Sequence, residues 1–333
     1  MGALSVGDVR TGTIPSLLPS QKHYLKVYSN SDPHDLRFKM ENSLIITAAS
    51  RGFGPSLLAL LGSLNLNWPN HPRVRVYDIG LDKGTLDILA ANQIEVRQVP
   101  PFCPHWRKHF AWKIWCWNDA PAHRVIWMDA GLVVLRPIEE ALYSIDSLGY
   151  FVVPTYHLLT ENASESACRG CGVDTGFREG KMTLAATLIG FKKEGQTAKI
   201  LEQSLSVALT EEHIASVDRM HRHDQAIISL LLYKHLGELV MADGIVYCGW
   251  LSPNQTPGQK VWVHRRAILP RDQAHLGSYL SGPGAPYLPG IPRRNGPFRT
   301  AWKTVFGIPE RYIRRAIRGQ IGKNEPPYNG IRD

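Results

Sequence analysis

Apolar and polar positions in residues 43–154 alternate between short apolar runs and longer segments with helical periodicity. The short runs predict strands at 43–49, 73–79, 94–98, 123–129 and 149–154. The longer segments predict helices at 55–64, 83–92 and 106–118. Strands and helices in this order indicate an α/β fold, with a mainly parallel central sheet, right-handed crossovers and flanking helices.

The pattern is looser after residue 154. Residues 155–182 are polar and contain Gly and Cys, which predicts a loop over the site. Further elements are predicted as a strand at 186–191, helices at 197–209 and 224–235, and a strand at 261–264. We therefore expect an irregular lead-in at 1–40, one α/β domain at 41–268, and a Pro/Gly-rich, basic extension at 269–333.

Composition narrows the class of protein. The chain of 333 residues has the apolar and charged fractions of a globular protein and no apolar run of about 18 residues. Met1–Ser20 lacks a basic start followed by an apolar core, so no signal peptide is expected. Five cysteines indicate a reducing compartment, and we expect a cytoplasmic protein. Cys168 and Cys171 lack the second pair that zinc would need, and the Asn162 sequon is uninformative without secretion.

The net charge of +9 is concentrated near the end of the chain. Residues 293–323 contain nine basic residues and one acid, which gives this segment a net charge of +8. Ile313 and Ile317 are four positions apart, which predicts a short amphipathic helix at 309–318. An anionic membrane surface is the expected partner. A tail helix packed on the domain is the alternative, and nucleic acid is not expected because no nucleic-acid motif accompanies the charge.

Asp129 is the most informative single position. It ends an apolar strand, and Ala130, Gly131 and a second apolar run follow it. A carboxylate at the carboxyl end of a buried strand lies where open α/β sheets bind ligands. The alternative is a turn, because Asp-Ala-Gly suits one.

An ordered series of motifs carries a family resemblance. The motifs are Ile46–Ala49, Val76–Leu81, an aromatic helix with Lys113, Trp127–Gly131, Ala186–Gly190, His223–Gln225 and Trp262–His264. Over roughly residues 43–265 the series resembles the GT-A glycosyltransferases, especially the family-eight-like and related bacterial branch. The resemblance implies a GT-A Rossmann-like fold. It also implies transfer of a sugar from a nucleotide-diphosphate donor, with a UDP-sugar favoured, to a saccharide or glycolipid acceptor.

Two other functional classes remain as alternatives to a glycosyltransferase. One is a non-catalytic relative that binds nucleotide sugars or carbohydrate, and the other is a sugar nucleotidyltransferase. The loop Ser50–Gly54 matches the nucleotidyltransferase phosphate loop poorly because it has no Lys. A dinucleotide-dependent dehydrogenase is not expected, since no GxGxxG follows a strand.

The resemblance assigns roles residue by residue. The implied catalytic residues are Asp129, Asp224 and Gln225. The implied nucleotide-sugar-binding residues are Thr47, Ala48, Ala49, Arg51, Asp78, Lys113, Asp129, Ala130, Gly131 and Gly190. The implied metal ligands are Asp129 and His264, with Mn²⁺ favoured because it accepts mixed nitrogen and oxygen ligands.

This sequence departs from the family at the acid-x-acid metal motif, where Gly131 replaces the second acid. One carboxylate holds a hard divalent ion weakly. The alternative is metal-independent transfer, with Lys113 and neighbouring cations neutralising the phosphates.

Structural roles also explain several of these positions. Residues 47–49 suit packing at a strand end, Asp78 suits a turn before Gly80, and Gly190 suits a bulge. Asp224 suits a helix cap, alone or together with sugar binding. Two histidines, at 221 and 223, do not make a zinc site by themselves.

Overall fold

The computed structural model describes residues 39–215, 221–248 and 259–263. Most of the predicted lead-in, His264 and the extension at 269–333 with its basic segment lie outside the described residues. Within the described residues, no helix has both the length and the apolar character needed to cross a membrane.

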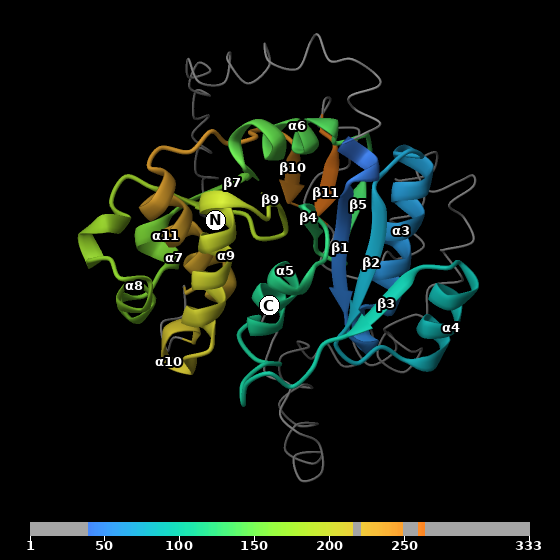
Figure 1. Ribbon diagram of the computed structural model, residues 1–333, viewed down its shortest axis with the longest axis horizontal. Helices are drawn as coiled ribbons and strands as arrows, with labels where there is room; N and C mark the ends of the chain where they lie inside the picture. The colour runs from blue at the N-terminus through green and yellow to red at the C-terminus, as the bar shows by residue number, and fades with distance from the viewer. Residues whose placement is uncertain (1–38, 216–220, 249–258, 264–333) are drawn as a thin grey trace, which may run out of the picture.

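A six-stranded mixed sheet forms the centre, in the order β3-β2-β1-β4-β9-β6 (Figure 1). The strands are β1 (Ser43–Ala49), β2 (Arg73–Asp78), β3 (Glu95–Gln98), β4 (Arg124–Met128), β6 (Tyr150–Phe151) and β9 (Leu188–Lys192). Strands β1 to β4 pair in parallel, whereas β9 runs antiparallel to both of its neighbours. The prediction of a mainly parallel α/β sheet is therefore confirmed.

Alternating side chains divide the core between the two faces of this sheet. One face carries Ile45, Ile126 and Met128 and packs against α3 (Gly54–Asn67), α4 (Lys83–Ala91) and α6 (Glu139–Leu148). The other carries Ile46, Val125 and Trp127 and packs against α5 (Ala111–Asp119), α9 (Gly195–Ala208) and α11 (His223–Leu236). Because both faces of the sheet are covered, the central strands β1 and β4 are buried throughout and read as mostly apolar runs, whereas β2 and β3, toward one edge of the sheet, keep exposed polar positions.

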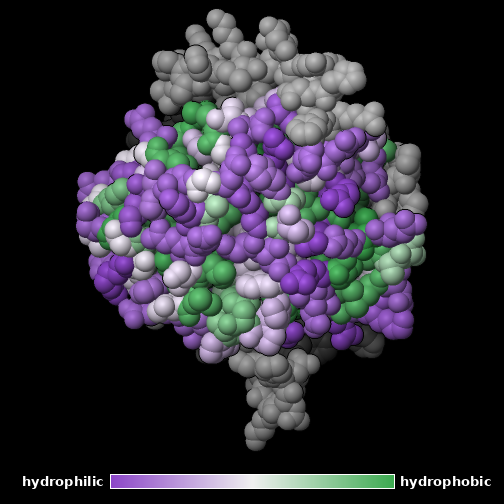
Figure 2. Space-filling model, viewed as in Figure 1, coloured by the Kyte–Doolittle hydropathy of each residue, from purple (hydrophilic) through white to green (hydrophobic). Residues whose placement is uncertain are grey.

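A second, three-stranded sheet joins distant parts of the chain. It has the order β10 (Val246–Cys248), β11 (Val261–Val263) and β5 (Leu132–Val134). The strand predicted at 261–264 is thus present, and it pairs antiparallel with the strand that follows Asp129. On the face shown in Figure 2, the described surface is mostly hydrophilic, with apolar residues in small separate groups.

The prediction of a loop at 155–182 was wrong. This stretch contains β7 (Pro154–Leu158), α7 (Leu159–Asn162), α8 (Glu165–Cys171) and the 3₁₀ turn η2 (Thr175–Arg178), and β8 (Met182–Leu184) follows it. Ser164 caps α8 by accepting a hydrogen bond from the Ala167 amide. The small side chains of Ala167, Cys168 and Cys171 are buried, so the Gly- and Cys-containing composition conceals a core helix.

Two predicted boundaries also need correction. The helix predicted from residue 106 begins at Ala111, because His109 and Phe110 adopt left-handed backbone angles (φ 54° and 58°) that interrupt a helix. The strand predicted at 149–154 is divided between β6 in the main sheet and β7 in a two-stranded sheet with β8. Helix α10 (Glu211–Ile214) is a short element that the sequence pattern did not predict.

Burial decides the role of two sequence motifs, the Cys168/Cys171 pair and the Asn162 sequon. Burial raises the pKa of the Cys171 thiol to about 12, and both thiols of the Cys168/Cys171 pair are buried. These cysteines therefore act as small core side chains. Asn162 is also buried, and its Nδ2 donates to Thr183 Oγ1 at 3.1 Å, so the sequon is not accessible for glycosylation.

Candidate active site

Three charged side chains from separate elements meet at the carboxyl end of β4. Lys113 Nζ lies 2.9 Å from Asp129 Oδ1 and 3.2 Å from Asp224 Oδ2. Lys113 belongs to α5, Asp129 follows β4, and Asp224 lies in the first turn of α11. The side chains of Lys113 and Asp224 are 5% and 6% exposed and that of Asp129 is 31% exposed, so this trio opens to solvent through Asp129.

The strand order explains why a ligand belongs at this point. Strands β2 and β3 lie on one side of β1, whereas β4 lies on the other side, so the direction of sheet growth reverses between β1 and β4. Ligands of open α/β sheets bind outside the carboxyl ends of the strands at such a reversal. Asp129 stands directly at that place.

The backbone around Asp129 fixes the direction of its carboxylate. Trp127 faces α5 from β4, and Asp129 is two residues later on the same face. The Trp127 indole Nε1 donates to Asp129 Oδ1 at 2.7 Å. The Asp129 carbonyl accepts from the Leu132 amide at 3.0 Å, which closes a turn into β5. Asp129 is therefore both a turn residue and a member of the trio.

The trio contains more negative than positive charge. For Lys113, burial acts to lower the pKa, but the nearby carboxylates outweigh burial and raise the pKa above its ordinary value. For Asp224, burial raises the pKa and Asp129 adds to the rise, with Lys113 opposing it. With both acids ionised the net charge is −1, so the trio can accept a further positive charge or a proton.

The helix-cap interpretation of Asp224 was wrong. Helix α11 has Arg222 as its N-cap residue, and no side chain makes a cap hydrogen bond there. Asp224 instead pairs with Lys113 across the gap between α11 and α5. A carboxylate in the first turn also interacts favourably with the positive end of the helix dipole. Gln225 follows on α11 and is half-buried.

Strained backbone positions support the helices that carry the trio. Among the described residues, four non-glycine residues have positive φ, and three of them (His109, Phe110 and His223) pack together. The His223 ring lies 5.1 Å from that of His109 and 6.0 Å from that of Phe110, between centroids. These residues begin α5 and α11, and strain of this kind persists only where the surroundings enforce it. The sequence pattern gave no signal for this strained cluster.

The residues predicted for the nucleotide lie at the ends of β1 and β2. Thr47, Ala48 and Ala49 are buried within the sheet. Asp78 Oδ1 accepts from the amides of Gly80 and Leu81, each at 2.6 Å, so its carboxylate stabilises the turn that the sequence also suggested. Their contact with a nucleotide stays a prediction.

Gly190 lies apart from the trio. It is in the middle of β9, and a Cβ placed on it would fall 2.5 Å from Ile145 Cδ1 of α6. Its Cβ direction is toward the sheet face covered by α6, whereas Asp129 faces α5. The glycine therefore permits close packing of α6, and the structure does not bring it together with Asp129.

The described residues do not fit a divalent cation by themselves. Among them, no group of three His, Cys, Asp or Glu side chains is arranged to hold a metal ion. Asp129 Oδ1 is already bound by the Lys113 ammonium and the Trp127 indole, and Gly131 offers no side-chain ligand. His221 and His223 both donate to the Ile214 carbonyl. The predicted ligand His264 lies outside the described residues.

Comparison with known proteins finds similar folds but no matching family. No family model matches the chain, and no curated protein matches it. A crystal structure of the galactosyltransferase LgtC with donor and acceptor sugar analogues is 14% identical, with a TM-score of 0.46 over 77% of this chain and 99% of that one. The apo bifunctional glycosyltransferase WbbM is 10% identical, with a TM-score of 0.48 over 72% of this chain and 50% of that one. At this level of similarity, the neighbours assign no role to any residue of this chain, so the site proposed below rests on the contacts of this chain.

Proposed function

We propose that the chain is a glycosyltransferase that moves a sugar from a nucleoside-diphosphate donor, with a UDP-sugar favoured, to a saccharide or glycolipid acceptor. The observation that carries this proposal is the buried Lys113–Asp129–Asp224 trio at the sheet reversal. A buried, unevenly charged group that opens to solvent at the ligand-binding edge is typical of a functional site. The family resemblance supplies the reaction class.

Each residue has a proposed part in this reaction. Asp129 is the exposed member of the trio and would contact the donor. Lys113 is buried and would act as a positioning residue that holds the two carboxylates. Asp224 and Gln225 would bind sugar hydroxyls. The small residues Ala130 and Gly131 leave room beside Asp129 for the donor to approach the backbone. Orienting the acceptor hydroxyl against the anomeric carbon supplies much of the rate enhancement in such reactions.

Two finer parts of the proposal concern regions outside the described residues. Mn²⁺ is the favoured cation, and His264 together with Asp129 would be its ligands. The basic segment 293–323 would attach the enzyme to an anionic membrane surface, where a glycolipid acceptor or a growing cell-surface polysaccharide is found. Co-sedimentation with phosphatidylserine vesicles tests the attachment. Equal binding to phosphatidylcholine vesicles would argue against a charge-driven contact.

A non-catalytic nucleotide-sugar-binding protein is the second candidate. Gly131, in the place of an acid, favours this alternative, because the family's metal motif is incomplete. The two candidates differ in whether bound donor is turned over.

The test is a screen of UDP-, GDP-, CMP- and dTDP-sugars by thermal shift and by donor hydrolysis, with and without Mn²⁺. We expect selective stabilisation by one donor, with slow sugar release. Asp129→Asn should lower the turnover rate by about 100-fold or more, because a carboxylate facing the reacting group is lost. Asp87→Asn, an exposed position on α4 paired with Lys83, is the matched control and should leave turnover unchanged.

The outcomes separate the candidates. Wild-type turnover in Asp129→Asn would remove the central assignment. Donor binding without release, in the presence of a panel of saccharide acceptors, would favour the non-catalytic protein. Absence of binding to every nucleotide sugar would show that the trio is only structural.

A further inference from the structure

Two arginines at the carboxyl edge of the sheet have no ion-pair partner among the described residues. Arg51 begins the 3₁₀ turn η1 (Arg51–Phe53) directly after β1. Arg107 lies between β3 and α5, and it was not among the residues predicted from the sequence. Both side chains are exposed. Other basic residues nearby are paired, such as Arg97 with Asp119 and Lys108 with Glu211.

Both arginines lie next to Gly80, in the turn after β2, Arg51 through its backbone and Arg107 through its side chain. The Arg51 amide donates to the Gly80 carbonyl at 2.7 Å. Arg107 Nη2 lies 3.9 Å from the position that a Cβ on Gly80 would take. Gly80 has φ +115°, which favours glycine, and the Asp78 carboxylate holds this turn. The Arg107 guanidinium also lies over the Trp106 ring, 4.6 Å from its centroid, which restrains the side chain.

The acids of this edge are already engaged in local contacts. Asp78 Oδ1 is bound by two amides of its own turn. Asp82 caps α4 by accepting from the amide and hydroxyl of Thr85. Asp87 pairs with Lys83 one turn along the same helix. The positive charges of Arg51 and Arg107 are therefore not neutralised by these acids, and the edge beside Gly80 is suited to an anion.

The turn at Gly80 lies close enough to the trio for one nucleotide sugar to reach both. Ala49 of β1 is opposite Asp78 of β2, and Ile46 of β1 is opposite Trp127 of β4. Only β1 lies between β2 and β4. The carboxyl end of β2, before Gly80, is therefore two strand spacings, roughly 10 Å, from the carboxyl end of β4, before Asp129. A nucleotide sugar whose sugar lies at Asp129 has its diphosphate within that span.

We propose that Arg107 and Arg51 form a guanidinium pair that binds the diphosphate of the donor. This inference rests on the proposed function and adds a phosphate-binding residue to it. A guanidinium is always charged and matches phosphate oxygens with two parallel N–H donors. Lys113 is not suited to this contact, because it is buried and its ammonium is bound to Asp129, Asp224 and the Ala186 carbonyl. Two cations at one edge favour a nucleoside diphosphate over a monophosphate.

Binding of UDP and UMP by isothermal titration calorimetry in EDTA, at 50 and 200 mM NaCl, tests the guanidinium pair. Arg107→Gln should weaken UDP binding about tenfold, the loss expected for one charge-assisted hydrogen bond. UMP binding should weaken less, and the dependence of UDP binding on salt should decrease. Arg51→Gln should act in the same direction. Arg73→Gln is the matched control, since Arg73 is exposed at the amino end of β2, the end away from Gly80.

A second variant guards against loss of folding. Arg107→Lys keeps the charge but not the paired donors, so it should bind UDP with an affinity between those of wild type and Arg107→Gln. If both Arg107 variants bind UDP as tightly as wild type, the proposal that the guanidinium pair binds the diphosphate is overturned, while the proposed function stands. If wild type binds none of UDP, GDP and dTDP, the proposed function fails, and this inference fails with it.

Discussion

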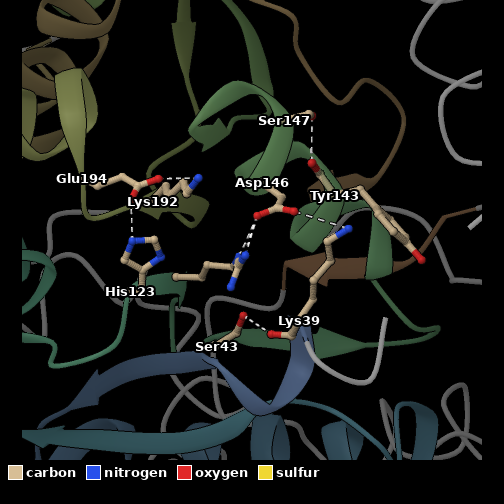
Figure 3. A network of polar contacts seen from close by, with 9 residues as sticks. Lys39, Ser43, His123, Tyr143, Asp146, Ser147, Lys192 and Glu194 are labelled. Atoms are coloured by element: carbon tan, nitrogen blue, oxygen red, sulfur yellow. Dashed lines mark hydrogen bonds and ion pairs between the residues drawn. The ribbon is translucent and has the colours of Figure 1, made fainter. Parts of the chain in front are cut away.

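Each end of the central sheet carries a cluster of acidic and basic side chains, but the ratio of acids to cations is reversed between the two ends. At the amino end, Asp146 of α6 meets two cations (Figure 3). The Arg124 guanidinium donates to Asp146 Oδ1 from Nε at 3.0 Å and from Nη2 at 2.5 Å, and Lys39 Nζ lies 3.4 Å from Oδ2. At the carboxyl end, one ammonium meets two acids.

The difference shows in the pKa of the acid at each end. Burial acts to raise the pKa of Asp146, but Arg124 and Lys39 outweigh burial and lower it. The pKa of Asp224 is raised instead, mainly because this carboxyl is more deeply buried and further because Asp129 is close, with Lys113 opposing the rise. An acid with a surplus of cations is simply held in place, whereas an acid without enough cations leaves the site able to respond to a ligand. The amino end is therefore structural and the carboxyl end is the candidate site.

The largest effect is expected from Lys113→Met. This change leaves two carboxylates without their cation, one of them buried, and it should lower the free energy of unfolding by about 3–5 kcal/mol at pH 7. Urea denaturation measures the loss. Lys83→Met, at an exposed position on α4, is the control and should change stability by less than about 0.5 kcal/mol. Unchanged stability in Lys113→Met would mean that the trio is not ionised as described.

Gly190→Ala lowers stability without changing either charged group. The new Cβ would overlap Ile145 Cδ1, so we expect a loss of about 1–3 kcal/mol. Adding Ile145→Val removes that atom and should recover part of the loss. Donor affinity should stay unchanged, because Gly190 faces α6 and the trio faces α5. A specific loss of donor binding in Gly190→Ala would restore the donor-sugar role predicted from the sequence.

Asp146→Asn should have a smaller effect, of about 1–2 kcal/mol, since this partly exposed acid loses its charge but keeps some hydrogen bonds. Donor turnover should stay at the wild-type rate. An Asp146→Asn enzyme with normal stability but impaired turnover would reverse the assignment of the two ends.

The dependence on pH is the finest of these tests. Because the pKa of Asp146 is lowered by folding, its stabilising contribution is present above the ordinary Asp pKa and is lost as pH falls through the lowered value. The stability difference between wild type and Asp146→Asn should therefore be constant near neutral pH and shrink in acid. Urea melts at pH 7, 5, 4 and 3 measure it. A difference that grows toward acid would contradict the ion pairing seen in Figure 3.

Local patterns predicted the first half of the fold well. Strands β1 to β4 and helices α3 and α4 lie close to their predicted ranges, because β1 and β4 are compact, mostly apolar runs and β2 alternates between polar and apolar positions. The stretch at 155–182 was misread because Ala167 and Cys168 are small, and their burial depends on elements far away in the chain. The left-handed residues before α5 carry little local signal, since bulky Phe110 does not favour that conformation and His109, although enriched in it, adopts it in only a small fraction of cases.

By itself, the sequence determined that Asp129 ends a buried strand and that Gly131 replaces an acid, because strand periodicity and residue identity are local properties. Only the tertiary structure decided that Lys113 and Asp224 meet at Asp129 and that Arg107 reaches Gly80. Contacts between charges on separate elements depend on how helices pack on the sheet. No spacing along the chain encodes that packing.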